Sequence, residues 1–140
     1  MEVTRTKDLN VLPFIKPLLE EFIKQEETTE YDVKKFLQYI RTNMSSPNLL
    51  IWVASGNKDE QFVVDGFSIA TVSADMSGAF VSISCLYGNS EETEKLILES
   101  MESWMRRNAI DVIAFTTKFP EKKFINYGFS VDNHFMVKSI

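Results

Sequence analysis

The sequence is poor in the residues that build cross-links and metal centres. Its 140 residues include one cysteine, Cys85, and one histidine, His134. A single cysteine cannot form an internal disulfide, which fits a reducing compartment. One cysteine and one histidine do not supply the ligand cluster that a bound metal ion needs, so no metal site is predicted. We interpret Cys85 as a buried thiol rather than a catalytic nucleophile.

Basic residues and long apolar runs are also scarce. Asp and Glu number 20 against 15 Lys and Arg, which gives a net charge of −5. Nucleic-acid binding requires a basic face, so nucleic acid is not an expected partner. No apolar run approaches the ~18 residues that span a bilayer, and the first residues lack the apolar core of a signal peptide. We expect a cytoplasmic protein that does not bind membranes.

Aromatic and aliphatic residues are well represented. Hydrophobic residues make up 44% of the chain, and 11 phenylalanines indicate an aromatic-rich core. This length suits one domain with a sizeable core, and no repeat, low-complexity tract or linker divides it. We therefore predict a single domain over residues 1–140.

The central feature of the chain is residues 78–108, a predicted strand that turns directly into an amphipathic helix. Residues 78–87 read as a half-buried strand, and residues 88–90 as a turn. The helix then carries Ile97, Met101, Trp104 and Met105 on one face. A helix N-terminus presents free N–H groups and a positive dipole end, so this junction is a candidate anion site.

The rest of the chain alternates between strand and helix patterns. We expect a kink or a late start at Pro17 in the first helix, and a capping box from Thr29 to Asp32 before the second. The predicted strands are 3–5, 49–55, 62–74, 110–116 and one or two within 129–140; the predicted helices begin near residue 8 or 10, at 33 and at 118. The order β-α-α-β-β-β-α-β-α-β indicates an α+β or mixed α/β fold with helices on both faces of the sheet.

This order, with three local stretches, resembles the GNAT superfamily of acyl-CoA-dependent N-acyltransferases. Residues 3–20 are similar to the opening strand and helix of that family, 96–110 to its long central helix, and 124–129 to the helix that ends in Gly-Phe. The resemblance implies a central mixed sheet of six to seven strands with helices on both faces. It also implies that the acyl-pantetheine arm threads a gap between the strands that end near Tyr87 and Thr116.

The sequence departs from the family at the pyrophosphate loop. The family pattern Arg/Gln-x-x-Gly-x-Gly/Ala aligns with residues 89–94, which contain neither the glycines nor the Arg or Gln. Glycines let backbone N–H groups approach the phosphates closely. Glu91, Glu92 and Glu94 stand there instead, as first-turn charges that complement the helix dipole. Asn89 and Glu92 have the spacing of a capping box.

A second departure concerns the general acid. Many family members have a tyrosine four residues before the Gly-Phe glycine, and this position is Phe124 here, which has no proton to give. Tyr127 or Tyr87 would have to substitute for it. We also predict that aromatic and apolar side chains fill the gap in place of pantetheine; the candidates are Leu86, Tyr87, Phe115, Phe119 and Phe124.

The favoured hypothesis is a GNAT-like fold with a degenerate acyl-CoA site, acting as a non-catalytic binding or structural module. It implies a protein partner, no cofactor, and a possible homo-oligomer. On this hypothesis the chain resembles GNAT-like proteins encoded in tailed-phage genomes, some of which are virion-associated. That resemblance implies a location in the host cytoplasm or in the virion.

Two alternatives stay open. The first is a divergent N-acetyltransferase that uses acetyl-CoA on an amine, with Tyr127 or Tyr87 as acid and a water molecule or Glu91 as base. Its cofactor contacts would come from Leu86, Tyr87, Gly88, Asn89, Ser90, Lys118 and Lys122. The second alternative is an unrelated α+β adaptor domain.

Overall fold

The computed structural model describes residues 1–25, 32–115, 122–130 and 138. Their strands form one five-stranded sheet in the order β1-β2-β3-β4-β5. The strands are β1 (Glu2–Arg5), β2 (Leu49–Lys58), β3 (Gln61–Asp75), β4 (Gly78–Gly88) and β5 (Ile113–Phe115). The first four pair antiparallel, and β4 pairs parallel with β5. The predicted mixed sheet is confirmed.

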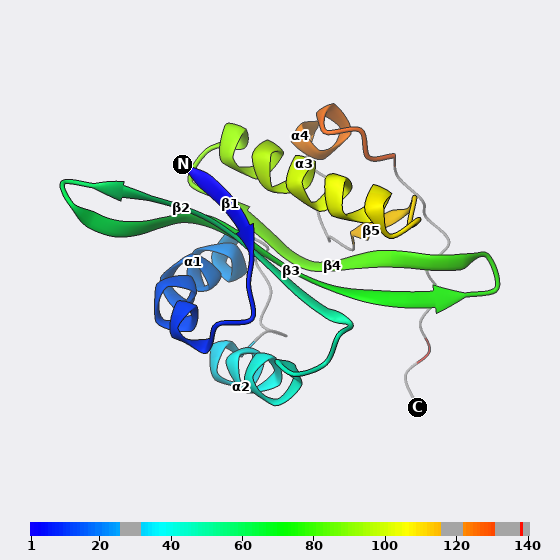
Figure 1. Ribbon diagram of the computed structural model, residues 1–140, viewed down its shortest axis with the longest axis horizontal. Coiled ribbons are helices and arrows are strands. Elements are labelled where there is room, and N and C mark those ends of the chain that lie inside the picture. The colour runs from blue at the N-terminus through cyan, green and yellow to red at the C-terminus, as the bar shows by residue number, and fades with distance from the viewer. Residues whose placement is uncertain (26–31, 116–121, 131–137, 139–140) are drawn as a thin grey trace.

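Helices cover both faces of this sheet (Figure 1). They are a short 3-10 turn η1 (Leu9–Val11), α1 (Leu12–Gln25), α2 (Val33–Asn43), α3 (Glu91–Arg107) and α4 (Lys122–Asn126). The helices α1 and α2 lie on one face, while α3 and α4 lie on the other. As predicted, α3 is the crossover between the two parallel strands. Within the described ranges, no helix is long and apolar enough to cross a membrane.

Each face of the sheet has its own hydrophobic core. The first core joins α1 and α2 to the sheet through residues such as Ile15, Ile40 and Phe67. The second packs Ile97 and Met101 of α3 against Trp52 and other sheet residues. Both cores hold side chains with almost no exposed surface. On its face of the sheet, α3 packs across β1, β2, β3 and β4.

The start of α1 agrees with the prediction only in part. Asp8 caps η1 by accepting a hydrogen bond from the Asn10 N–H at 2.9 Å, and α1 then runs from Leu12 through Pro17 without a late start. Proline at this position removes one backbone hydrogen bond. The apolar face that includes Ile15 and Leu19 is fully buried, and this burial outweighs the local cost.

The start of α2 also differs. Asp32 is itself the N-cap, because its carboxylate accepts hydrogen bonds from the N–H groups of Lys34 at 2.9 Å and Lys35 at 3.4 Å. The predicted capping box gave Asp32 the third helical position and is wrong. Thr29, its expected partner, lies outside the described residues.

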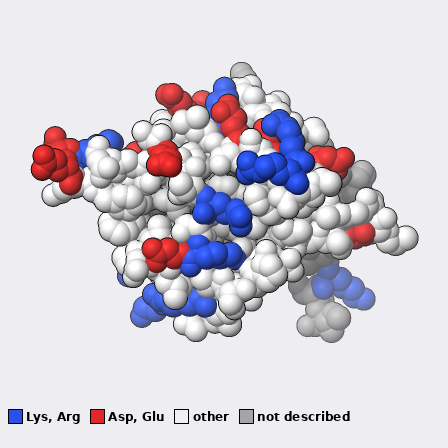
Figure 2. All heavy atoms as spheres, viewed as in Figure 1, with Lys and Arg blue, Asp and Glu red and all other residues white. Residues whose placement is uncertain are grey.

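The β2–β3 hairpin is longer than predicted. The sequence pattern ended the strand at Ser55, whereas β2 continues to Lys58 and leaves only Asp59 and Glu60 in the turn. Both turn residues have positive φ, 51° and 63°, as in a type I′ turn. The hairpin tip projects from the body of the molecule and carries acidic side chains (Figures 1 and 2).

The region after α3 agrees only in part with the predicted strand 110–116. Strand β5 is limited to Ile113–Phe115, and its residues are half-buried. In the part of the chain that the structure describes, β4 is its only neighbour. The predicted strands within 129–140 lie largely outside the described residues. The stop at Gly128 is confirmed, since its φ of 100° ends α4.

Candidate functional site

The parallel strands β4 and β5 share only a short register. Their pairing runs from Val81 with Ile113 to Ile83 with Phe115. Strand β4 continues to Gly88 beside β3, with an irregularity that leaves Ser84 without a partner between the pairs Ile69–Cys85 and Ala70–Ile83. This bulge turns the strand just where its pairing with β5 ends among the described residues. The end of β4 therefore borders the candidate site.

Aromatic rings gather beyond that point. Phe115 and Phe124 meet edge to face with ring centroids 5.0 Å apart, and Phe129 lies 6.3 Å from Phe124. Phe124 is 7% exposed and belongs to the core under α3. These contacts hold α4 close to β5, so Phe124 acts as a packing residue at the position where the family resemblance implies an acid.

The other predicted gap fillers divide between the two faces of the sheet. Leu86 is buried in the core under α3, together with Phe124. Tyr87 is half-buried and packs instead against the core under α1 and α2. Phe119 lies outside the described residues. Successive side chains of a strand point to opposite faces of the sheet, so Leu86 and Tyr87, which were predicted to fill the same gap, lie in different cores.

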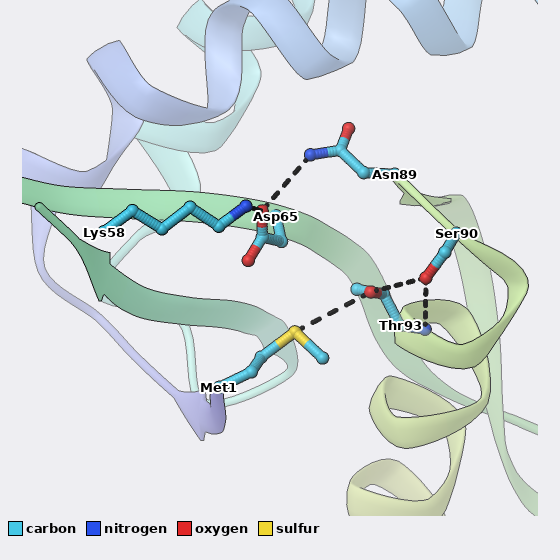
Figure 3. Close-up of polar contacts among 6 residues, drawn as sticks. All are labelled: Met1, Lys58, Asp65, Asn89, Ser90 and Thr93. Carbon is cyan, nitrogen blue, oxygen red and sulfur yellow. Dashed lines mark hydrogen bonds and ion pairs between the residues drawn. The ribbon is translucent and has the colours of Figure 1, made fainter.

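The first turn of α3 is closed by Ser90 (Figure 3). The Ser90 Oγ accepts a hydrogen bond from the Thr93 N–H at 3.2 Å and lies 3.0 Å from the Thr93 hydroxyl. The Ser90 carbonyl accepts from the Glu94 N–H at 3.2 Å. The predicted capping box of Asn89 and Glu92 is therefore wrong. The N-cap of α3 is Ser90, one residue later than predicted.

Asn89 contacts β3 instead. Its backbone N–H donates to the Asp65 carbonyl at 2.8 Å, and its side-chain amide donates to the Asp65 carboxylate at 3.3 Å. Lys58 from the β2–β3 hairpin forms an ion pair with the same carboxylate at 3.5 Å (Figure 3). The turn before α3 is thus tied to a strand more than twenty residues earlier in the chain.

Two glycines let the first turn of α3 approach the sheet closely. A Cβ atom on Gly66 would lie 2.7 Å from the Tyr87 carbonyl oxygen and 2.8 Å from the Thr93 methyl carbon. A Cβ atom on Gly88 would lie 3.0 Å from Glu94. Only glycine fits at such distances, so these glycines serve helix–sheet packing.

The three carboxylates of the first turn are not equivalent. Glu91 and Glu92 are exposed, but Glu94 is 3% exposed. The Tyr127 hydroxyl donates to the Glu94 carboxylate at 2.9 Å. Glu94 lies in the first turn of α3, as predicted, but its carboxylate is buried and paired, which the sequence analysis did not predict. Its spacing from Ile97 and Met101 places it on the buried helix face, and this signal was missed.

The remaining sequence candidates are placed as follows. Tyr127 lies over the first turn of α3, whereas Tyr87 belongs to the opposite core. Lys118 lies outside the described residues, as do the side chain of Lys122 and His134. Cys85 is fully buried, and burial raises the pKa of its thiol, so the predicted buried thiol is confirmed. No metal-binding group of His, Cys, Asp and Glu occurs among the described side chains.

Comparisons with known proteins identify the fold. No family model and no curated protein matches the sequence. Solved structures do match. An aminoglycoside 6′-N-acetyltransferase from Acinetobacter haemolyticus superposes with a TM-score of 0.77 at 11% identity, over 100% of this chain and 98% of that one. This chain has the fold of the GNAT acetyltransferases.

Further structures agree on the GNAT fold. A predicted acetyltransferase from Clostridium acetobutylicum, solved with acetyl-CoA, has a TM-score of 0.75 at 12% identity, over 99% of this chain and 95% of that one. A probable acetyltransferase has a TM-score of 0.76 at 13% identity, over 100% and 97%. The predicted GNAT-like fold is therefore confirmed, and the alternative of an unrelated α+β fold is wrong. At sequence identities of 11 to 13%, this structural similarity establishes the fold but not the activity.

Proposed function

We propose that this chain is a GNAT-fold protein that does not transfer acetyl groups and instead binds another protein. The observation that carries the proposal is the first turn of α3, which the chain's own groups occupy. The Ser90 Oγ accepts a hydrogen bond from the Thr93 N–H there, and the hydroxyl of Tyr127, the residue after α4, donates to the Glu94 carboxylate. The proposal follows from comparing this turn with what acetyl-CoA requires.

The first turn of α3 disfavours the pyrophosphate of CoA. The family resemblance implies that backbone N–H groups receive it, but the Thr93 N–H already donates to the Ser90 Oγ, and the Glu94 N–H makes the first hydrogen bond of the helix, to the Ser90 carbonyl. The exposed carboxylates of Glu91 and Glu92 stand beside them. Two like charges ~5 Å apart repel by about 3 kcal/mol at an effective dielectric constant of ~20, before screening by salt. An incoming phosphate is therefore opposed rather than attracted.

The pantetheine arm meets a second obstacle. The rings of Phe115 and Phe124 pack against each other where β4 and β5 cease to pair. Burying one such ring is worth about 2 to 3 kcal/mol, and a ligand entering there has to displace it. The hydrogen bond between Tyr127 and Glu94 adds a tie between α4 and α3.

Acid catalysis also lacks a suitable group among the described candidates. Phe124 has no ionisable proton, and Tyr127 donates its hydroxyl proton to a buried carboxylate. Tyr87 packs on the α1 and α2 side of the sheet. A general acid has to lie within hydrogen-bonding reach of its leaving group. This arrangement supports a module without transferase activity.

Calorimetric titration with acetyl-CoA and with CoA tests the proposal. We expect no heat and no thermal shift at millimolar ligand, because the pyrophosphate is repelled and the gap is filled. A dissociation constant in the micromolar range would overturn it. The variant E91Q/E92Q serves as a comparison. If the carboxylates alone exclude CoA, this variant gains binding, and if the rings also block the gap, it does not.

The second candidate function is a divergent N-acetyltransferase. It is favoured by the bulge at Ser84 and by the stretch of β4 beyond Ile83, which has no β5 partner among the described residues. The release of CoA thiol from acetyl-CoA in the presence of amines, followed with a thiol reagent, would detect it. Cys85 is buried and does not contribute to that signal. The cytoplasmic or virion location, the phage origin and the homo-oligomer stay predictions.

A further inference from the structure

The strand β1 forms an edge of the sheet whose outer side has no strand partner among the described residues. It pairs only with β2, in an antiparallel register without a bulge. The Thr6 N–H, just beyond β1, donates to the Ile51 carbonyl of β2 at 2.9 Å. Because residues along an antiparallel ladder alternately face toward and away from the partner, Thr4 also faces β2. The N–H and C=O groups of Val3 and Arg5 therefore point away from the sheet.

Apart from its short length and its charged ends, Glu2 and Arg5, β1 has none of the features that usually shield a sheet edge. It contains no proline, and no bulge turns it away. The guanidinium of Arg5 lies over the Trp104 ring of α3, 5.5 Å from the ring centroid. A row of outward N–H and C=O groups is a template on which another extended chain can pair. This geometry favours the addition of a strand at β1.

Two positive charges lie close together at the end of β1. Arg5 is exposed, and the Lys7 Nζ donates to the carbonyls of Ser46, at 2.8 Å, and of Leu49. Partial burial and the nearby Arg5 charge both lower the pKa of Lys7. Within the described residues, neither cation forms an ion pair. A carboxylate placed beside both would offset their mutual repulsion.

The surface around β1 is basic although the whole chain has a net charge of −5. In the shared view of Figures 1 and 2, β1 lies in front of the other strands, between α1 and α3. Lys and Arg side chains form a band across the middle of this view, and most Asp and Glu side chains lie nearer its margins (Figure 2). The exposed Arg107 follows Trp104 by one helical turn, on the side of α3 that Arg5 contacts. This surface is complementary to a segment rich in carboxylates.

We propose that β1 binds an extended, acidic segment of a partner protein, which adds to the sheet as a further strand. The backbone of that segment pairs with Val3 and Arg5. Its carboxylates, spaced two residues apart, lie on the side of Arg5 and Lys7, because alternate side chains of a strand share one face. The inference rests on the proposed protein-binding function, and it names the chemistry of the partner.

The test is an NMR titration of the full ¹⁵N-labelled chain with the capped peptide acetyl-Thr-Glu-Thr-Glu-Thr-amide at millimolar concentration. Threonine favours extended structure, and both glutamates fall on one face. The matched probe replaces both glutamates with glutamine. We expect the acidic peptide to bind about threefold or more tightly than this probe at low ionic strength. It should also slow hydrogen exchange of the Val3 and Arg5 amides but not of the Thr4 amide, which already faces β2.

Variants separate backbone pairing from charge. Val3→Pro removes an N–H that faces away from β2, whereas the control Val3→Ala keeps it, so we expect only the first to lose most of the peptide affinity. Arg5→Gln is expected to weaken binding of the acidic peptide about threefold and to leave the glutamine peptide unaffected. Lys95→Gln makes the same charge change nine residues before Trp104, on the opposite side of α3, and is expected to leave the titration unchanged.

Three results would overturn the proposal: absent binding at millimolar peptide, equal binding of the two peptides, or equal effects of Arg5→Gln and Lys95→Gln. Protection of the Val3 and Arg5 amides before peptide is added, in a chain that sediments as a dimer, would also overturn it, because a second copy would then occupy the edge. If Val3→Pro unfolds, the exchange pattern of residues 3–5 and the Arg5→Gln variant decide. Titration of the same sample with acetyl-CoA keeps the outcomes distinct, because CoA binding would refute the proposed function and leave the result at β1 readable.

Discussion

Removing the Tyr127 hydroxyl tests the contact between α4 and the first turn of α3. In Tyr127→Phe the ring stays, including its edge-to-face contact with Phe124 at 6.0 Å, while the hydroxyl's hydrogen bonds to the Glu94 carboxylate at 2.9 Å and to the Glu91 carbonyl at 3.5 Å are lost. A hydrogen bond to a charged acceptor contributes about 1.5 to 3 kcal/mol net. Glu94 is 3% exposed, so water does not readily replace the donor. Since Glu94 has a further interaction, we expect the lower half of that range, about 2 kcal/mol.

The assay is urea unfolding followed by circular dichroism, with thermal unfolding in parallel. For a chain of this size, about 2 kcal/mol corresponds to a fall in Tm of roughly 6 °C. The matched control is Tyr39→Phe, since Tyr39 is 44% exposed on α2 and its hydroxyl makes no hydrogen bond within the described residues. We expect this control to change stability by less than about 0.5 kcal/mol.

A double-mutant cycle of Tyr127→Phe with Glu94→Gln isolates the pairwise contribution. We expect a coupling energy of about 1 to 2 kcal/mol, in the range seen for residues that share one hydrogen-bond network. Equal losses in Tyr127→Phe and Tyr39→Phe, with no coupling to Glu94, would refute the reasoning. In that case Tyr127 would not hold α4 on α3, and the support it lends to a closed site would be lost.

Three further predictions concern residues around the site. Gly66→Ala is expected to lower the free energy of unfolding in urea by about 1 to 3 kcal/mol, because the new Cβ would lie 2.7 Å from a carbonyl oxygen. The control Gly56→Ala, whose Cβ would have its nearest contact at 3.7 Å, is expected to be neutral or slightly stabilising. Equal effects of the two would contradict the close approach of β3 and α3. Asp59→Asn combined with Glu60→Gly is expected to stabilise the hairpin by about 1 kcal/mol, since both positions have positive φ, and an unchanged unfolding midpoint would count against this turn. The Cys85 thiol is expected to react with a thiol reagent only when the chain unfolds, because burial raises its pKa; rapid labelling of the folded protein would disprove its burial.

Local patterns in the sequence determined the elements and much of their order. The period of Ile97, Met101 and Met105 predicted α3 and its buried face, and Gly128 predicted the end of α4. These features depend on neighbours within a few residues, so they can be read without knowing the fold. The missing loop glycines were equally visible, since a residue type is a property of the sequence itself.

Only the tertiary structure decided which groups meet at the site. Asn89 has the spacing of a helix cap, yet it bonds to Asp65, and Ser90 takes the cap. Glu94 was predicted as a first-turn charge, and only the structure shows that Tyr127, thirty-three residues later, donates a hydrogen bond to it. Each outcome depends on a contact between segments distant in the sequence, and burial changes the energetic value of a polar group by more than local preference does. For this reason the fold followed from the pattern of the chain, while the state of its candidate site followed from the packing of α3 and α4.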